Sequence, residues 1–185
     1  MMFARTSRLT LRPGWPEDAR ALSEAIGHEA VVTRLARVPW PYALGDAQTF
    51  LQRQRGGSDP FFLILLHEGS DTRLIGGIGI HQEADGVPQL GYWLTPAAWG
   101  RGYATEAGAA VVSMARHALG HKRLHAWHFV DNPASGRVLA KLGFHPTGRI
   151  EPRFSLARGG ETPGVGYELT LAGEDSTDDP MRIAA

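Results

Sequence analysis

The segment 91–107 constrains the fold more than any other part of this sequence. It reads Gly-Tyr-Trp-Leu-Thr-Pro-Ala-Ala-Trp-Gly-Arg-Gly-Tyr-Ala-Thr-Glu-Ala, which is a strand-like run, a turn with two glycines and the start of a helix. Glycine lets a backbone turn tightly and approach a ligand closely. The first N–H groups of a helix lack partners within it and lie at the positive end of its dipole, where phosphate groups bind. The segment therefore predicts a phosphate-binding turn around Gly100 and Gly102, although a lone Gly-x-Gly is also compatible with a plain connection.

Two common nucleotide-binding patterns do not fit these glycines. Neither Gly100-Arg101-Gly102 nor Gly77-Ile78-Gly79 is followed by a glycine three residues later, as a dinucleotide-binding fold requires. The Lys-Ser/Thr pair of a P-loop is also missing from this turn. The predicted phosphate site therefore belongs to another class.

Hydrophobic periodicity places the turn in a mixed α/β domain. Alternating apolar residues indicate strands, and apolar residues three or four apart indicate helices. The longest helical pattern follows the turn and ends before Gly120, a natural stop. Strands are expected at 7–12, 61–67, 73–81, 87–94, 123–130, 144–150 and 164–171, two or three short helices within 16–50, and longer helices at 102–119 and 133–142.

Composition excludes several kinds of chemistry. The 185 residues, 43% of them hydrophobic, suit one domain, which we expect over residues 1–171. Cysteine is absent, which excludes disulfides, a thiolate nucleophile and a Cys-ligated metal. Lys plus Arg and Asp plus Glu number 19 each, so no uniformly basic surface for direct binding of nucleic acid is expected. Residues 172–185 are expected to form a flexible tail, and no signal-like or membrane-spanning run is seen, which predicts a cytoplasmic protein without membrane contact.

A second motif delimits the helix expected at 133–142. Asn132 is a favoured N-cap, Pro133 suits the first helical position and Gly143 suits the left-handed position after the helix, with Phe144 packing back. Ser135 lies three and four residues before the apolar positions 138 and 139, so its hydroxyl should point along the buried stripe. Two uses of this hydroxyl stay open: a hydrogen bond to a nearby backbone group, or a donor that faces a reaction centre.

With these residues in place, the sequence resembles the GNAT acetyltransferase superfamily. The run Trp-Gly-Arg-Gly-Tyr-Ala at 99–104 is similar to its acyl-CoA signature Gln/Arg-x-x-Gly-x-Gly/Ala, with Trp99 in place of Gln/Arg. Asn-Pro-Ala-Ser at 132–135 and Lys-Leu-Gly-Phe at 141–144 are similar to the second signature of the branch that includes RimJ- and RimL-type ribosomal-protein N-terminal acetyltransferases. The resemblance covers about residues 5–171, including Arg-Leu-Thr-Leu-Arg-Pro at 8–13.

This resemblance implies a fold and a cosubstrate. The fold is α/β, with a mixed, mostly antiparallel central sheet of about seven strands flanked by helices. Strands 87–94 and 123–130 splay apart in the middle of the sheet to admit the pantetheine arm of acetyl-CoA. Residues expected to bind this cosubstrate are Trp93, Leu94, Thr95, Trp99, Gly100, Arg101, Gly102, Tyr103, Ala104, Thr105, Asn132, Ser135 and Arg137. Because the family binds pyrophosphate mainly through backbone amides, the change to Trp99 affects one side-chain contact.

The resemblance also implies residues for the chemistry at the thioester. Asn132 and Ser135 reach the pantetheine arm and the thiol, and Ser135 is a candidate proton donor to the departing thiolate. Backbone amides within 87–94 are candidates for polarising the carbonyl. The absence of cysteine excludes a cysteinyl acyl-enzyme, and direct attack in a ternary complex is implied.

The general base is the least clear assignment. Members of this branch often carry Glu two residues before Gly-Tyr-Trp, where this chain has Gln89, and an amide cannot accept the proton. His81 is the candidate substitute, because it shares a strand face with two glycines that leave room beside it. A surface histidine at a strand end is the alternative reading, and Glu83 or a chain of waters could serve instead.

Other polar and aromatic clusters carry weaker signals. A metal site is not expected from the histidines between 117 and 128, because the elements that carry them point apart. Five aromatic residues could line an acceptor groove, but core packing explains them equally well: Trp15, Trp40, Tyr42, Phe61 and Trp93.

The leading hypothesis is thus an N-acetyltransferase that uses acetyl-CoA. Its acceptor would be a primary amine, either a protein N-terminus or a small molecule. The alternative is a non-catalytic sensor or interaction module that binds acyl-CoA, motivated by an intact phosphate turn beside a missing glutamate. An unrelated nucleotide-binding domain is a third possibility, which predicts stabilisation by ATP or NAD and not by CoA.

Overall fold

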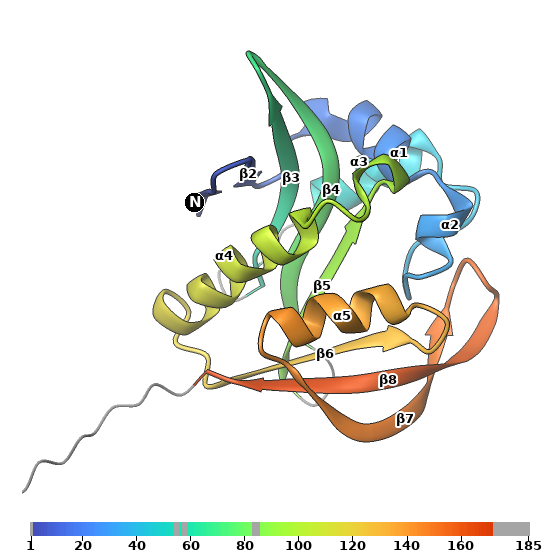
Figure 1. Cartoon of the computed structure of the whole chain (residues 1–185). Coiled ribbons are helices and arrows are strands. Elements are labelled where there is room, and N and C mark those ends of the chain that lie inside the picture. Colours follow the sequence, from blue (N-terminus) through green and yellow to red (C-terminus); the bar gives the residue numbers. More distant parts are fainter. Residues whose placement is uncertain (1, 54–55, 57–58, 83–85, 172–185) are drawn as a thin grey trace, which may run out of the picture.

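Eight strands form one sheet in the order β1-β2-β3-β4-β5-β6-β8-β7 in the computed structural model of this protein (Figure 1). Neighbouring strands are antiparallel except β5 and β6, which pair in parallel. The structure describes residues 2–53, 56, 59–82 and 86–171. The strands are β1 (Ala4–Arg5), β2 (Leu9–Arg12), β3 (Phe61–Glu68), β4 (Asp71–Gln82), β5 (Pro88–Leu94), β6 (Arg123–Phe129), β7 (His145–Ser155) and β8 (Gly160–Thr170).

Helices cover both faces of the sheet. The helices α4 (Tyr103–His117) and α5 (Pro133–Lys141) lie in front of the strands in Figure 1. The shorter helices α1 (Ala19–Ile26), α2 (Glu29–Val32) and α3 (Leu44–Gln52) belong to the other face. Side chains of β5 alternate between the two: Leu90 and Leu94 join the core beneath α4, whereas Trp93 packs with the residues of α1–α3. Single 3₁₀ turns occupy Pro16–Asp18 and Pro96–Ala98.

The sheet divides between β5 and β6. Among the described residues, the parallel pairing of these strands consists of Gln89 opposite His125 alone. On its other side β5 pairs with β4 along its whole length, from Pro88 to Leu94. The expected splay is therefore confirmed, and beyond Gln89 no described strand pairs with the β6-facing edge of β5.

The last hairpin is longer than the sequence predicts. The expected strands at 144–150 and 164–171 are β7 and β8, which extend to Ser155 and back to Gly160, with Pro152 paired opposite Pro163. Proline disfavours the interior of a strand and so conceals this hairpin in the sequence. It is tolerated here because β7 is the edge strand, and the Pro163 carbonyl still accepts a hydrogen bond from the Val130 N–H at 2.9 Å.

Most other expected elements are present with ends shifted by a few residues. The eighth strand, β1, spans two residues, which is too short for periodicity to reveal. The predicted flexible tail at 172–185 lies outside the described residues. Among the described residues, no helix has the length and apolar character needed to cross a membrane.

Candidate functional site

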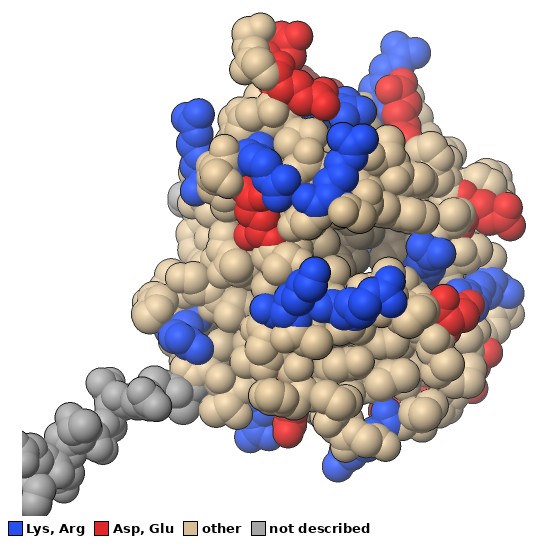
Figure 2. Space-filling view, viewed as in Figure 1, with Lys and Arg blue, Asp and Glu red and all other residues tan. Residues whose placement is uncertain are grey.

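A cavity of about 720 Å³ opens where β5 and β6 separate. Its volume lies in the range of small-molecule and cofactor sites. Residues of β4, β5, α5 and the turn before α4 line it, together with residues from the α1–α3 side of the sheet. Figure 2 shows this face of the molecule hollowed above α5, with Lys and Arg side chains on both sides of the hollow. The cavity thus reaches both faces of the sheet through the split.

The glycine turn before α4 has the geometry of an anion site. Gly100 and Gly102 have φ of 72° and 81°, in the left-handed region that favours glycine. The first intrahelical bond runs from the Glu106 N–H to the Gly102 carbonyl at 3.0 Å, so the preceding N–H groups have no partner within the helix. A Cβ atom built on Gly100 would meet nothing within 4 Å, so a ligand can approach the backbone there. The turn therefore has the features of a backbone site for an anion such as a phosphate group.

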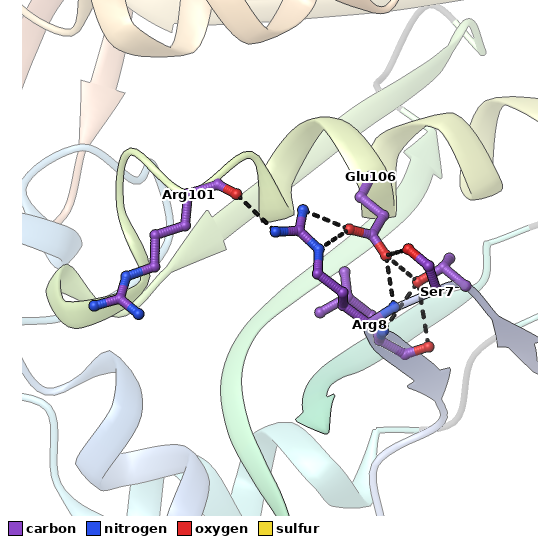
Figure 3. Close-up of polar contacts among 6 residues, drawn as sticks. Ser7, Arg8, Arg101 and Glu106 are labelled. Carbon is purple, nitrogen blue, oxygen red and sulfur yellow. Dashed lines mark hydrogen bonds and ion pairs between the residues drawn. The ribbon is translucent and has the colours of Figure 1, made fainter. Parts of the chain in front are cut away.

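Glu106 fastens this turn to the N-terminal strand (Figure 3). Its Oε1 accepts hydrogen bonds from the Thr6 hydroxyl at 2.6 Å, the Ser7 hydroxyl at 3.0 Å and the Arg8 N–H at 2.9 Å. Its Oε2 accepts from Arg8 Nε and Nη2, both at 2.7 Å. Arg8 Nη1 also donates to the Arg101 carbonyl at 3.1 Å. One carboxylate thus joins residues about a hundred positions apart in the sequence.

The hydrogen bonds to Glu106 set its protonation state. Burial alone would raise the pKa of this carboxyl, but the hydrogen bonds from Thr6 and from the Arg8 backbone and side chain outweigh burial and lower the pKa to about 2. Glu106 is therefore ionised at neutral pH and stabilises the first turn of α4. Sequence reasoning missed this role; the available signal was an acidic residue in the first turn of a helix.

Ser135 and Tyr92 meet across the split. Their hydroxyl oxygens are 2.7 Å apart, and the Tyr92 hydroxyl is also 3.1 Å from the Ser135 carbonyl. Tyr92 comes from β5 and Ser135 from the first turn of α5, and both line the cavity. Burial, with a smaller contribution from Tyr167, raises the pKa of Tyr92 to about 12, and the hydrogen bond to Ser135 opposes that rise. Tyr92 therefore keeps its proton at neutral pH, a role that sequence reasoning did not assign.

His81 and Gln89 lie side by side on the opposite face of β5 from Tyr92. They are directly paired in the β4–β5 register, and the Gln89 amide nitrogen is 3.2 Å from His81 Nε2. Both line the cavity, so His81 is not simply a surface histidine at a strand end. The His81 ring lies over Gly91, where an added Cβ would be in van der Waals contact with its Cε1 at 3.5 Å. Glu83, the alternative candidate for the general base, lies outside the described residues.

Asp59 adds a carboxylate that sequence reasoning missed. It precedes Pro60, whose carbonyl accepts the Ile80 N–H at 2.9 Å, so the β3–β4 ladder continues one residue past Phe61 opposite Gly79. Asp59 lines the cavity, and its buried Oδ1 has no hydrogen-bond partner within the described part of the chain. A buried acceptor without a partner calls for a donor, which an incoming ligand can supply.

The structure divides the expected cosubstrate residues into two groups. Trp93, Leu94, Trp99, Gly100, Ala104, Asn132 and Ser135 line the cavity. The following residues are not part of its lining: Thr95, Arg101, Gly102, Tyr103, Thr105 and Arg137. The Tyr103 ring is buried beneath the Arg8 guanidinium, whose carbon lies 4.5 Å from the ring centroid. Within the turn, Trp99, Gly100 and Ala104 therefore lie against the cavity, whereas the Tyr103 side chain packs away from it.

Asn132 corrects one detail of the second motif. It occupies the N-cap position of α5, but its side chain makes no capping hydrogen bond and its φ and ψ are −118° and 61°. The favoured-cap interpretation is therefore wrong for the side chain, which lines the cavity instead. Gly143 has the expected left-handed conformation, with φ of 87°, and Phe144 is buried behind it.

The remaining histidines and aromatic residues separate by location. No group of three or more His, Cys, Asp or Glu suited to a metal ion occurs within the described ranges. His128 is buried, and its Nδ1 donates to the Phe129 carbonyl at 2.7 Å.

Of the aromatic candidates for an acceptor groove, Tyr42, Phe61 and Trp93 line the cavity, whereas Trp15 and Trp40 are more than 40% exposed outside it.

Comparisons with known proteins agree with this geometry. The family model described as "Acetyltransferase (GNAT) domain" matches residues 8–145. "Uncharacterized N-acetyltransferase YoaA" from Bacillus subtilis (strain 168) is 35% identical over 153 residues, which cover 77% of this chain and 82% of that protein. "Probable N-acetyltransferase YjcK" from the same organism is 43% identical over 82 residues, 43% of this chain and 45% of that protein.

Solved structures show the same fold. The GNAT-family acetyltransferase from Bacillus anthracis has a TM-score of 0.77 at 22% identity, covering 92% of this chain and 99% of its own. A ribosomal L7/L12 α-N-protein acetyltransferase, RimL, determined in complex with coenzyme A, has a TM-score of 0.74 at 17% identity, covering 91% and 98%. At these identities the likeness concerns the fold.

Proposed function

This chain belongs to the GNAT acetyltransferase family and is an acyl-CoA-dependent acetyltransferase, and from that premise we propose that it acetylates a primary amine by direct attack within a ternary complex. The observation that carries the proposal is the cavity through the split sheet. It brings Tyr92 and Ser135 from one side together with His81 and Gln89 from the other. A donor and an acceptor can therefore approach the same point from opposite faces.

Acetyl-CoA, the cosubstrate, supplies the acetyl group as a thioester. The residues present fit it: the left-handed glycines and the N–H groups at the start of α4, which have no partner within the helix, suit its pyrophosphate, and the split between β5 and β6 suits an extended arm. Asn132, Ser135 and the backbone of β5 would hold that arm. The β6-facing edge of β5 beyond Gln89 has backbone groups that no strand in the described part of the chain pairs with, and N–H groups there are suited to polarise a carbonyl oxygen.

Tyr92 and Ser135 would deliver the proton that the leaving sulfur needs. The Tyr92 hydroxyl keeps its proton because burial raises its pKa to about 12. The 2.7 Å contact lets Ser135 donate to the thiolate while its oxygen accepts from Tyr92. The pair can thus act as a short relay, in which the role expected of Ser135 alone is shared by two hydroxyls.

His81 would accept the proton that the amine loses. Gln89 cannot accept this proton, but its amide touches His81 Nε2 and can hold the ring in place. Asp59, with a buried oxygen that lacks a partner among the described residues, offers a carboxylate to the positive charge of the acceptor. These residues support a position for the acceptor amine on the face of β5 that bears Gln89.

The acceptor class follows the branch that the motifs resemble. RimL-type enzymes, one of which shares this fold, suggest a protein N-terminus, and a small-molecule amine is the other member of the class proposed. Tyr42, Phe61 and Trp93 would give the acceptor side of the cavity an aromatic wall.

The test is turnover of acetyl-CoA across a panel of peptide and small-molecule amines, followed by His81→Asn. We expect His81→Asn to lower kcat by about 100-fold, because general base catalysis contributes about that much, while CoA affinity stays unchanged. His117→Asn, an exposed histidine at the end of α4, is the matched control and should retain full activity. Tight CoA binding without turnover by the unmodified protein on any amine would favour the acyl-CoA sensor.

A further inference from the structure

The first position of the acyl-CoA signature holds Trp99, where Gln or Arg is expected, and the structure brings an arginine to that place from elsewhere. The Arg34 guanidinium carbon lies 4.7 Å from the centroid of the Trp99 ring. Arg34 follows α2, far from the signature in sequence. Arg34, Trp99 and Gly100 all line the cavity. The Arg34 guanidinium thus lies beside the phosphate turn, although the first residue of the signature, Trp99, carries no charge.

Trp99 is fixed as a platform for this guanidinium. Its Nε1–H donates to the Leu94 carbonyl at 2.8 Å, which ties the indole to the end of β5. The indole remains 38% exposed, so its face is accessible to the arginine. A guanidinium stacks well on an aromatic face. Its N–H donors lie in its own plane, parallel to the ring, and so stay available to an anion that binds in a bidentate way.

The positive charge of Arg34 is not neutralised by an ion pair within the described part of the chain. The acidic group whose charge it affects is Asp131, and that carboxylate is held by Arg158 through Nη1 at 2.8 Å and Nη2 at 3.1 Å. These hydrogen bonds are the main cause of the lowered pKa of Asp131, to which Arg34 contributes less. Arg34 is therefore available to an anionic ligand.

Arg101, the cation within the signature, is placed differently. It is exposed and is not part of the cavity lining. Figure 3 shows its side chain extending away from Arg8 and Glu106, while its carbonyl accepts the hydrogen bond from Arg8. The Arg101 backbone therefore helps to hold the turn, whereas its guanidinium lies outside the cavity lining.

We propose that Arg34, stacked on Trp99, is the side-chain cation that binds a phosphate of acetyl-CoA at the turn before α4. This inference rests on the proposed function, since it assumes that the pyrophosphate lies at Gly100. The side chain missing from the signature is thus replaced from the opposite face of the sheet, and the tryptophan positions the replacement. Phosphate recognition then combines backbone N–H groups with one guanidinium.

The experiment compares two acetyl donors. Acetyl-CoA carries the phosphates, and acetyl-pantetheine presents the same thioester and arm without them. We expect Arg34→Gln to raise the KM for acetyl-CoA and the Kd for CoA about tenfold, equivalent to ~1.4 kcal/mol, and to change the KM for acetyl-pantetheine less than twofold. Arg34→Lys, which keeps the charge but loses the planar stack, should lie between. Arg20→Gln, an exposed arginine on α1 paired with Glu24, controls for net charge and should match the parent protein.

Each outcome decides the inference. Unchanged CoA affinity in folded Arg34→Gln overturns it, as does an equal loss for both donors, which would indicate a structural or acceptor role. A loss of CoA affinity in Arg101→Gln without a loss in Arg34→Gln assigns the cation to Arg101 and also overturns it. If the unmodified protein neither binds CoA nor uses acetyl-CoA, the proposed function itself fails. Trp99→Leu gives an independent check, because removal of the platform should weaken CoA binding while Arg34 is still present.

Discussion

The phosphate turn and the seam between β5 and β6 are built in different ways. The turn is continuous in sequence, from Leu94 to Glu106, and its shape comes from two left-handed glycines and a helix start. The seam is assembled from groups on separate elements, with Tyr92 on β5 against Ser135 on α5 and His81 on β4 against Gln89. Local sequence can therefore specify how a cosubstrate is bound, whereas the chemistry depends on how distant strands and helices meet. Variants in the seam should change kcat, and variants in the turn should change affinity.

The largest expected effect lies in the seam. Ser135→Ala removes the hydroxyl proposed to donate to the sulfur, and we expect kcat to fall about 100-fold, because proton delivery to the sulfur is lost. The Kd for CoA should change less than threefold. Tyr92→Phe leaves the Ser135 hydroxyl in place but removes its 2.7 Å partner, so its kcat should fall less, about tenfold. Steady-state rates at saturating substrates and CoA titration by calorimetry measure both quantities; equal losses in affinity and rate would contradict the division.

The next effect lies in the turn. Gly102→Glu places a bulky anion where the backbone has φ of 81° and a Cβ would lie 3.6 Å from Arg8 Nη2. We expect the Kd for CoA to rise at least tenfold, about 1.4 kcal/mol, through repulsion of the phosphates and a displaced turn.

The control for this variant is Gly120→Glu. Gly120 also has positive φ, 65°, with open space around it, but it lies beyond the other end of α4. Both substitutions carry a similar backbone strain, so circular dichroism should show similar thermal destabilisation. CoA affinity should fall in Gly102→Glu alone. If folded Gly102→Glu binds CoA as the parent does, the turn is only a connector.

The smallest effect concerns the fastening of the turn. Glu106→Gln weakens the hydrogen bonds from Thr6, Ser7 and Arg8 and should lower the free energy of unfolding by about 1 kcal/mol at pH 7. The folded pKa of Glu106 is about 2, below its ordinary value of 4.5. The carboxylate therefore stabilises the fold above pH 4.5 and loses that contribution as the pH falls through about 2.

Urea denaturation of the parent protein and Glu106→Gln at several pH values measures this contribution. The difference between them should be full at pH 7 and shrink as the pH drops from 4.5 toward 2. Arg20→Gln should show no such pH dependence, since its partner Glu24 is 71% exposed. A difference that stays constant with pH would mean that Glu106 acts through packing and not through its charge.

Several parts of the site could be predicted from the sequence because their causes are local. The left-handed Gly100, Gly102 and Gly143 follow from a residue without a side chain at positions where a turn or helix end requires positive φ. The start of α4 at Tyr103 and of α5 at Pro133 follow from turn and helix signals within a few residues. Those elements carry the phosphate turn and Ser135, which the sequence therefore located.

Other parts depended on contacts that no short stretch of sequence contains. Glu106 accepts hydrogen bonds from residues about a hundred positions away in the sequence. Arg34 packs on Trp99 from a segment on the other face of the sheet. The Asp59 Oδ1 atom is buried without a hydrogen-bond partner among the described residues. The last hairpin was concealed because proline disfavours strands. Pro152 is tolerated in the edge strand β7, and Pro163 lies in β8 just past the last residue paired with β6, so both depend on how the strands are arranged.

The sequence by itself thus determined the succession of most strands and helices along the chain, the conformation of the glycine turns and the family of the chain. These follow from backbone sterics and hydrophobic periodicity, which act over a few residues. Only the tertiary structure decided which hydroxyl faces Ser135, which residue supports His81 and which cations lie beside the turn. Such contacts depend on strand register and helix packing, because alternation along a strand sends neighbouring side chains to opposite faces and leaves the choice of partner to the assembled sheet.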